Sequence, residues 1–245
     1  MKFEDVEKFA VVLSSGNGER FGANRVGKHL VEIGSVPSLV WAVSTLLSNH
    51  NLFSEIVIVT REHEQRETQK VLDRFFELES VRISVIAGGG TRMESFVNAV
   101  NFINGKSQPA DQALLMLVDA NRPLFSNAQV LGLLQGGLNG QGSCLTRPVV
   151  DGIAEVRGGR IRGVPNKDDF FEFVTPEVAS LKVVNSLLDA GEGPPRSLVE
   201  FHLAAGHYPE MVPASSSNMK LTYPEDLQIL EELAKQLSKP QPLSS

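Results

Sequence analysis

The chain has 245 residues, 42% of them hydrophobic, and a net charge of −6. This composition supports a full core, and the length fits one large α/β domain with a small arm. The negative charge argues against a nucleic-acid binder, which needs a basic surface to neutralise phosphates. Cys144 is the only cysteine, so no intrachain disulfide can form, which fits the reducing cytoplasm. No apolar run approaches the ~20 residues of a membrane helix, so we expect a cytoplasmic protein without membrane contact.

The first half of the chain alternates apolar runs with amphipathic segments. The pattern predicts strands over 9–13, 55–60, 81–87 and 113–118, and helices over 37–47, 61–77 and 92–103. Such alternation indicates a single doubly wound, mostly parallel, Rossmann-like sheet. Ligands bind these sheets at the carboxyl ends of the strands.

The pattern changes in the second half. Two short polar–apolar segments, 151–156 and 160–164, flank Gly158-Gly159 and predict a protruding β-hairpin arm of about 148–172. We expect helices over 177–188, 198–205 and 223–237, and a short strand over 211–214. Thr222 and Glu225 have the spacing of a capping box for the last helix. The chain is thus expected to form one domain, 1–238, followed by a flexible tail, 239–245.

A glycine-rich loop follows the first predicted strand and reads Ser14-Ser15-Gly16-Asn17-Gly18-Glu19-Arg20-Phe21-Gly22. The dinucleotide pattern G-x-G-x-x-G fails here because Phe21 replaces the third glycine, and Thr60 ends the next strand in place of an acidic residue. The segment from Gly22 to Lys28 matches the P-loop, but His29 then stands where Ser or Thr should ligate magnesium.

Two interpretations of this loop remain. In one, Gly16 and Gly18 wrap a triphosphate, while Arg20 and Lys28 supply cations from within the loop and from its far side. Nucleotidyl transfer needs such cations, because attack on the α-phosphate accumulates negative charge on its oxygens. In the other, the segment is an ordinary glycine-rich turn with solvated Arg and Lys.

Two further strand ends carry polar groups. The run from Gly88 to Arg92 opens the third predicted helix, where free N–H groups suit an anion or a base carbonyl, and Ser95 lies one turn further on. Asp119 follows the 113–118 strand and is a natural Mg²⁺ ligand beside a triphosphate, with Arg122 placed to hold a phosphate. Taken singly, Arg92 could instead form a surface ion pair and Asp119 could cap a turn.

Together these residues resemble the cytidylyltransferases that include the methylerythritol phosphate enzymes of isoprenoid synthesis and the ribitol phosphate enzymes. The family pattern small-small-G-x-G-x-R followed by Lys is similar to 14–20 plus Lys28, and G-G-x-x-R-x-x-S is similar to 88–95. The turn H-D-A-x-R-P is similar to 118–123, and N-x-K-[IV]-T-x-P-E-D-L matches 218–227 closely. The resemblance spans nearly the whole chain.

The resemblance implies CTP and a phosphorylated polyol as substrates, Mg²⁺ as cofactor and a homodimer formed through the arm. It implies catalytic roles for Arg20, Lys28 and Lys220, and a metal-binding role for Asp119. The nucleotide site is then expected to comprise Ser14, Ser15, Gly16, Asn17, Gly18, Gly89, Arg92, Ser95 and Asp119. The acceptor side is expected to comprise Arg122, Asp151, Lys167 and Thr222.

The chain departs from the family pattern mainly on the acceptor side. Val118 replaces the His before Asp119, Gly152 replaces a Thr, Lys167 lies about where an Arg is usual, and Arg196-Ser197 falls near a Thr-Asp pair. The acceptor therefore stays open between methylerythritol phosphate, ribitol phosphate and another anionic compound. A catalytically silent nucleotide-binding paralogue is the alternative of a different class.

Overall fold

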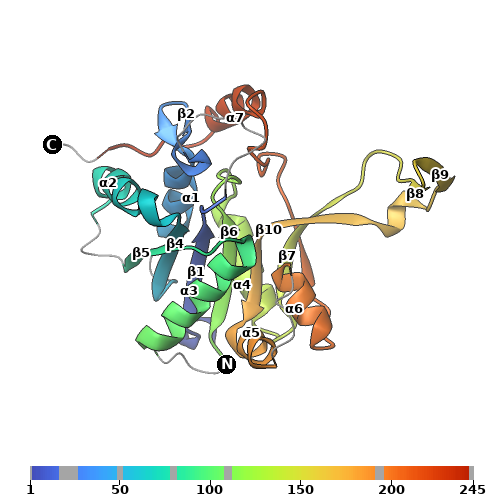
Figure 1. The fold of residues 1–245 in the computed structure, drawn as a ribbon, viewed down its shortest axis with the longest axis horizontal. Coiled ribbons are helices and arrows are strands. Elements are labelled where there is room, and N and C mark those ends of the chain that lie inside the picture. The colour runs from blue at the N-terminus through green and yellow to red at the C-terminus, as the bar shows by residue number, and fades with distance from the viewer. Residues whose placement is uncertain are drawn as a thin grey trace.

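The computed structural model describes residues 2–16, 27–48, 52–77, 82–107, 112–190 and 196–242. Its centre is a seven-stranded sheet with the order β11-β7-β10-β6-β1-β4-β5 (Figure 1). The strands of this sheet are β1 (Lys8–Leu13), β4 (Glu55–Thr60), β5 (Ile83–Ala87), β6 (Leu114–Asp119), β7 (Ser143–Pro148), β10 (Phe171–Ser180) and β11 (Glu210–Pro213). The helices are α1 (Ser38–Leu47), α2 (Gln65–Phe75), α3 (Arg92–Ser107), α4 (Asn127–Gly137), α5 (Leu181–Asp189), α6 (Leu198–Ala204) and α7 (Asp226–Ala234).

The parallel half of the sheet brings the predicted site segments to one edge. Strand β1 pairs in parallel with β4 and β6, so Leu13 lies level with both Val59 and Asp119. Strand β5 continues this arrangement beyond β4, where Thr60 is level with Ala87. Every residue of β1 is buried, as expected for a strand covered on both faces. The predicted α/β class and the mostly parallel sheet are confirmed.

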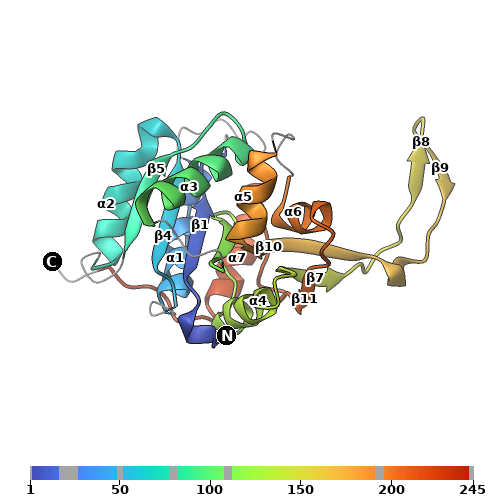
Figure 2. The same ribbon diagram turned by 90° about the horizontal axis from the view of Figure 1, so that it is seen from below.

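Helices cover both faces of the sheet and form two cores (Figure 2). Apolar side chains of α3, α5 and α6, such as Phe96 and Phe201, pack on one face. Those of α1 and α4, such as Leu39 and Leu133, pack on the other. A third cluster joins α7 to α1 and to the small hairpin of β2 (Glu32–Ile33) and β3 (Val36–Pro37) through Trp41, Leu221 and Leu230. This third cluster anchors the C-terminal segment beside the carboxyl edge.

The helix predicted over 177–188 is wrong in its first part. Strand β10 runs to Ser180, between β6 and β7 and antiparallel to both, and α5 begins at Leu181. Val178 packs into one core and Ala179 into the other, which is the alternation of a strand buried on both faces. Strand pairing on two sides therefore outweighs the local helical spacing. Strand β7 and helix α4 were not predicted, although a Ser126–Gln129 capping box begins α4.

Helix α7 is shorter than predicted and begins differently. The carboxylate of Asp226 accepts hydrogen bonds from the backbone N–H groups of Thr222 and Tyr223, each at 2.7 Å. Glu225 precedes the helix and makes no side-chain cap. The predicted capping box of Thr222 and Glu225 is therefore wrong, because Asp226 takes its place.

A β-hairpin lies within the predicted arm. Strands β8 (Glu155–Arg157) and β9 (Arg160–Gly163) pair antiparallel and project from the body beyond β7 and β10 (Figures 1 and 2). Gly158 and Gly159 join them with φ of 58° and 70°, a conformation that favours glycine. The arm and the adjoining start of β10 expose apolar side chains, namely Val150, Val156, Ile161, Val164, Phe170, Phe171 and Phe173.

No helix within the described part of the chain has both the length and the apolar character that crossing a membrane requires.

Candidate active site

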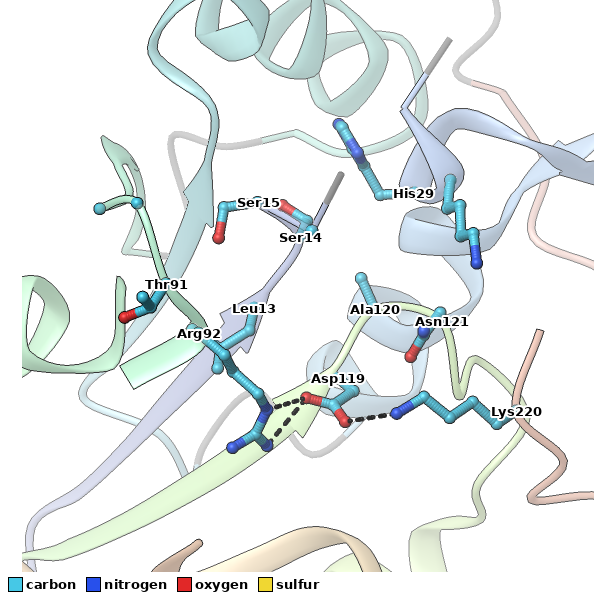
Figure 3. A pocket seen from close by; sticks show the side chains of 14 residues that line it. Leu13, Ser14, Ser15, His29, Thr91, Arg92, Asp119, Ala120, Asn121 and Lys220 are labelled. Carbon is cyan, nitrogen blue, oxygen red and sulfur yellow. Dashed lines mark hydrogen bonds and ion pairs between the residues drawn. The ribbon is translucent and has the colours of Figure 1, made fainter. Parts of the chain in front are cut away.

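A pocket of about 390 Å³ opens at the carboxyl edge, where β1, β5 and β6 end (Figure 3). The described residues that line it are Leu13, Ser14, Ser15, Gly16, Lys28, His29, Gly89, Gly90, Thr91, Arg92, Asp119, Ala120, Asn121 and Lys220. The three strand-end segments singled out in the sequence therefore meet in one place. The predicted site residues Asn17, Gly18 and Arg20 lie outside the described residues.

Serine hydroxyls join the first strand end to the start of α3. The Oγ of Ser14 donates to the carbonyl of Val59 at 2.7 Å, which fixes the exit of β1 against β4. The hydroxyls of Ser15 and Ser95 lie 2.8 Å apart, and the Gly89 N–H donates to Ser95 Oγ at 3.1 Å. Ser95 is fully buried, so it supports this side of the pocket from behind the lining residues.

Gly88 must be glycine for these segments to approach one another. A Cβ at this position would lie 2.7 Å from Ser95 Oγ and 2.9 Å from Ser15 Cβ. The glycine run therefore serves close packing of the β1 and β5 ends. At the N-terminus of α3, the Thr91 N–H donates to Glu94 Oε2 at 3.1 Å.

Asp119 is the centre of charge in the pocket. Its Oδ1 accepts hydrogen bonds from Arg92 Nη2 at 2.9 Å and Nε at 3.1 Å, and Lys220 Nζ lies 3.6 Å from its Oδ2 (Figure 3). Burial alone would raise the pKa of the Asp119 carboxyl, but Arg92 and Lys220 hold it below its ordinary value. Asp119 is therefore ionised at neutral pH, and Arg92 pairs with it instead of making a separate surface ion pair.

Lys28 reaches the pocket from the far side of the glycine-rich loop. Its Nζ donates to the Thr222 carbonyl at 3.0 Å, and its own carbonyl accepts from Ser38 Oγ at 3.1 Å. The neighbouring His29 is buried, and its Nε2 lies 3.0 Å from Thr68 Oγ1. Burial lowers the pKa of His29 to about 4, so this ring is neutral at pH 7.

The charges of the described lining suit an anionic ligand. Lys28, Arg92 and Lys220 are three cations against the single carboxylate of Asp119, which leaves two positive charges. A polyphosphate is the natural ligand for such a surface.

One carboxyl near the pocket was missed at the sequence level. Glu177 on β10 is buried and accepts a hydrogen bond from the Val199 N–H at 3.1 Å. Burial raises the pKa of Glu177 to about 7. The prediction of a helix over 177–188 concealed this residue. In the structure Glu177 is a strand residue that pairs with Leu117, so it lies near the end of β6 that carries Asp119.

The predicted acceptor residues do not all meet at the pocket. Arg122 lies beside it, with Nη1 donating to the Asn218 carbonyl at 3.0 Å, and Thr222 contacts Lys28 through its carbonyl. Asp151 and Lys167 lie at the arm, where Lys167 Nζ donates to the Val150 carbonyl at 2.7 Å. Neither is among the described residues that line the pocket of this chain.

The residues present fit a magnesium ion that is held mainly by a nucleotide. No cluster of three or more His, Cys, Asp or Glu side chains that could hold a metal occurs among the described residues. Asp119 supplies one ionised carboxylate in a pocket suited to phosphates. Mg²⁺ often binds through one or two carboxylates plus substrate phosphates, so a dedicated protein cage is not required.

A doubly wound sheet with glycine segments, cations and one carboxylate at its carboxyl edge defines an α/β nucleotide-binding protein of the nucleotidyltransferase class. The family model for 2-C-methyl-D-erythritol 4-phosphate cytidylyltransferase (IspD) matches residues 9–236. The chain belongs to this family and is a nucleotidyltransferase.

Individual relatives agree with this assignment. The 2-C-methyl-D-erythritol 4-phosphate cytidylyltransferase of Haemophilus ducreyi is 26% identical over 225 residues, which cover 91% of this chain and 93% of the relative. That of Bordetella petrii is 27% identical over 228 residues, 91% of this chain and 96% of the relative. A ribitol-5-phosphate cytidylyltransferase of Lactiplantibacillus plantarum is 20% identical over 234 residues, 94% of this chain and 99% of the relative.

Solved structures share the fold. A crystal structure of 4-diphosphocytidyl-2C-methyl-D-erythritol synthase superposes with a TM-score of 0.76 at 23% identity, covering 94% of this chain and 98% of the other. The corresponding enzyme of Anaerococcus prevotii gives a TM-score of 0.78 at 18% identity, covering 94% and 99%.

Proposed function

We propose that the chain transfers a cytidylyl group from CTP to 2-C-methyl-D-erythritol 4-phosphate or a closely related polyol phosphate. The observation that carries this proposal is the pairing of Asp119 with Arg92 and Lys220, in a pocket that Lys28 and the glycine segments also line. Membership of the cytidylyltransferase family supports CTP as the nucleotide.

In the proposed reaction an oxygen of the acceptor phosphate attacks the α-phosphorus of CTP. The bond from that phosphorus to the bridging oxygen breaks, and pyrophosphate leaves. Lys28 and Lys220 stabilise the charge that develops on the α-phosphate oxygens, and Arg20, outside the described residues, is proposed to do the same. Asp119 and the phosphate oxygens would hold Mg²⁺, which supplies neutralisation of the triphosphate charge when bound.

The nucleotide is proposed to lie along Ser14, Ser15, Gly16 and Gly89, with Ser95 supporting the base side. The loop residues Asn17 and Gly18 are proposed to complete the phosphate contacts. On the acceptor side we propose Arg122 and Thr222 from the body, and Asp151 and Lys167 from an arm.

Since Asp151 and Lys167 lie at an arm that projects from its own body, we propose a homodimer in which each arm serves the partner's pocket. The exposed apolar side chains of the arm support this arrangement, because a partner surface would cover them. A cytoplasmic location is proposed from the biosynthetic character of the family.

The direct test is pyrophosphate release with CTP and Mg²⁺ across a panel of polyol phosphates. We expect the highest kcat/KM with 2-C-methyl-D-erythritol 4-phosphate, and ribitol 5-phosphate is the principal competitor in the panel. A Lys28→Ala variant should lose the turnover. Binding of CTP by calorimetry without turnover on any acceptor would instead identify a silent nucleotide-binding paralogue.

A further inference from the structure

Glu177 is a buried carboxyl to which the proposed reaction gives no role, and only 2% of it is exposed. It lies on β10, where its backbone is level with Leu117 of β6 and Cys144 of β7. Its side chain lies on the same face of the sheet as that of Ala179, which packs in the core formed with α3, α5 and α6. A buried carboxyl is costly unless it is hydrogen-bonded, so its contacts indicate what it does.

The contact of Glu177 lies in the first turn of α6. Its Oε2 accepts a hydrogen bond from the backbone N–H of Val199 at 3.1 Å. Val199 is the second residue of this helix, and the first N–H groups of a helix find no acceptor within the helix itself. Glu177 therefore supplies the missing acceptor and fastens the start of α6 to a strand in the middle of the sheet.

The turn that leads into α6 is tied to the same point. Ser197 Oγ accepts from the Glu200 N–H at 3.1 Å, and Glu200 Oε2 accepts from the Arg196 N–H at 2.7 Å. These two bonds between side chain and backbone hold the turn in one arrangement. The bond from Val199 to Glu177 therefore fixes where the carbonyl of Arg196 lies.

Arg92 joins the Arg196 carbonyl to Asp119. Its Nη1 donates to that carbonyl at 3.0 Å, while its Nη2 and Nε donate to Asp119 Oδ1 at 2.9 Å and 3.1 Å (Figure 3). A guanidinium is a rigid planar fork, so a guanidinium that is bound on both sides cannot turn without losing one of its contacts. The position of the Arg196 carbonyl therefore sets the angle at which Arg92 meets Asp119.

Charge links Glu177 to Arg92 as well. Burial is the main cause of the raised pKa of Glu177, and both the Val199 N–H and the Arg92 guanidinium oppose this rise. The carboxyl and the guanidinium thus attract each other through space, in addition to their connection through the start of α6. A change at Glu177 is therefore transmitted to Arg92 by two routes.

We propose that Glu177 is a positioning residue for the active site, whose bond to the first turn of α6 holds Arg92 in its pairing with Asp119. The proposal rests on the proposed function in one respect, namely that the Arg92–Asp119 pair serves the bound substrates or their metal. Groups that orient a binding side chain from behind are usually needed for full activity, although they touch neither metal nor substrate.

The test uses two substitutions at Glu177 and one control. Glu177→Met removes the oxygen acceptor at nearly unchanged length, whereas Glu177→Gln keeps an oxygen that can accept from Val199. Glu55→Met is the matched control, because Glu55 is 3% exposed on β4 and pairs with Lys106 at the amino edge of the same sheet. Pyrophosphate release gives kcat/KM for Mg²⁺–CTP, and thermal unfolding shows whether each variant folds. Glu177→Ala takes the place of Glu177→Met if that variant does not fold.

Glu177→Met should lower kcat/KM by ~10- to 100-fold, the usual cost of removing a group that orients an active-site side chain. Glu177→Gln should stay within about threefold of wild type, because its amide oxygen accepts the same hydrogen bond. Glu55→Met should lose stability and keep its kcat/KM. Adding Glu177→Met to an Arg92→Ala protein should cause no further loss, because the residue through which Glu177 acts is already gone.

A second readout needs no turnover. It is the solvent exchange of the Arg92 Nε proton in ¹H–¹⁵N spectra, where the signal is assigned by its absence in Arg92→Ala. We expect slow exchange in the wild type, because this proton is bonded to Asp119, and faster exchange in Glu177→Met. Glu177→Gln and Glu55→Met should exchange as the wild type does.

Three results would overturn the proposal. One is a loss of kcat/KM in Glu177→Met that is no greater than in Glu177→Gln, since the hydrogen bond would then not matter. Another is a full further loss when Glu177→Met is added to Arg92→Ala. The third is unchanged exchange of the Arg92 proton in a folded Glu177→Met protein. If the wild-type protein releases no pyrophosphate with any acceptor, the proposed function fails, while the exchange measurement still decides the role of Glu177.

Discussion

The pocket and the arm are built in opposite ways. The pocket lies at the edge of a sheet covered by helices, and its walls are tied by hydrogen bonds such as Ser15–Ser95 and Leu221–Asn121 across long stretches of chain. The arm is a hairpin that stands away from the body and exposes apolar side chains. The described residues thus form a charged pocket within one chain, whereas we propose that the arm packs on a partner's surface. The resemblance to the family pattern differs between the same two regions. The residues of the expected nucleotide site match the pattern, whereas those of the acceptor side depart from it.

The largest expected effect tests the pocket. Lys220→Ala should lower kcat/KM by ~10²- to 10³-fold, the usual cost of removing one donor to transition-state charge. The effect should appear mainly in kcat, measured by pyrophosphate release under saturating substrates. Lys235→Ala is the control, because Lys235 lies directly after α7, is exposed and pairs with Glu232 of that helix. Equal activity of both variants would show that the charge beside Asp119 does not serve catalysis.

A second test uses the buried carboxyl behind the pocket. Because the pKa of Glu177 is raised to about 7 from 4.5, its protonated form stabilises the fold. This stability is fully present below pH 4.5 and is lost as pH rises through 7. In Glu177→Gln the free energy of unfolding relative to wild type should therefore rise by roughly 2–3 kcal/mol between pH 4.5 and 8.

The measurement is chemical denaturation of both proteins across this pH range. Only the difference between them is informative, because the buried His29 and His202, each with pKa lowered to about 4, change stability in the opposite direction. A difference that does not vary with pH would show that Glu177 is ionised in the folded protein.

A third test separates the arm from the pocket. Lys167→Ala should raise KM for the acceptor by about tenfold, the effect of losing one charge-assisted hydrogen bond, and should leave CTP affinity within twofold. Mixing Lys167→Ala with Lys220→Ala protein and allowing subunits to exchange should restore part of the turnover, because one pocket of a mixed dimer then has both residues. No recovery in a mixture proven to contain mixed dimers would place Lys167 at its own chain's pocket.

The smallest expected effect is that of changing Gly27, which precedes Lys28 and packs against the ring of His29. A Cβ on Gly27 would lie 2.6 Å from Glu64 Oε1 and 2.7 Å from His29 Nδ1, so Gly27→Ala must displace the ring next to Lys28. We expect a loss of about 1 kcal/mol in stability from this overpacking, with a modest fall in kcat/KM. Gly105→Ala on α3 meets open space and should be neutral or slightly stabilising.

The parallel half of the fold could be predicted because buried strands appear as continuous apolar runs that end in glycine or polar turns. From this, the convergence of Ser14, Gly89 and Asp119 at one edge followed directly, and the structure confirms it. The antiparallel half was harder. Strand β10 is partly exposed where it runs toward the arm and buried further on, so neither strand nor helix spacing holds along its length.

Lys220 and Asn121 show why site residues escape local patterns. Lys220 was predicted as a site residue from the family resemblance alone. Its approach to Asp119 depends on a backbone hydrogen bond from Leu221 to Asn121, which joins distant parts of the chain. Asn121 itself is an ordinary turn residue in the sequence, and only the pocket reveals its buried, unpartnered oxygen. The roles of Arg20, Asn17 and Gly18 stay predictions.

The backbone hydrogen bond from Leu221 to Asn121 also has a consequence for the synthesis of the protein chain itself. All other cations lining the described pocket belong to the first 92 residues, whereas Lys220 emerges from the ribosome a hundred residues after the turn that receives it. A nascent or prematurely terminated chain lacks this last charge even when its N-terminal strands have paired. If Lys220 has the proposed catalytic role, we expect a chain that ends before it to release no pyrophosphate from CTP.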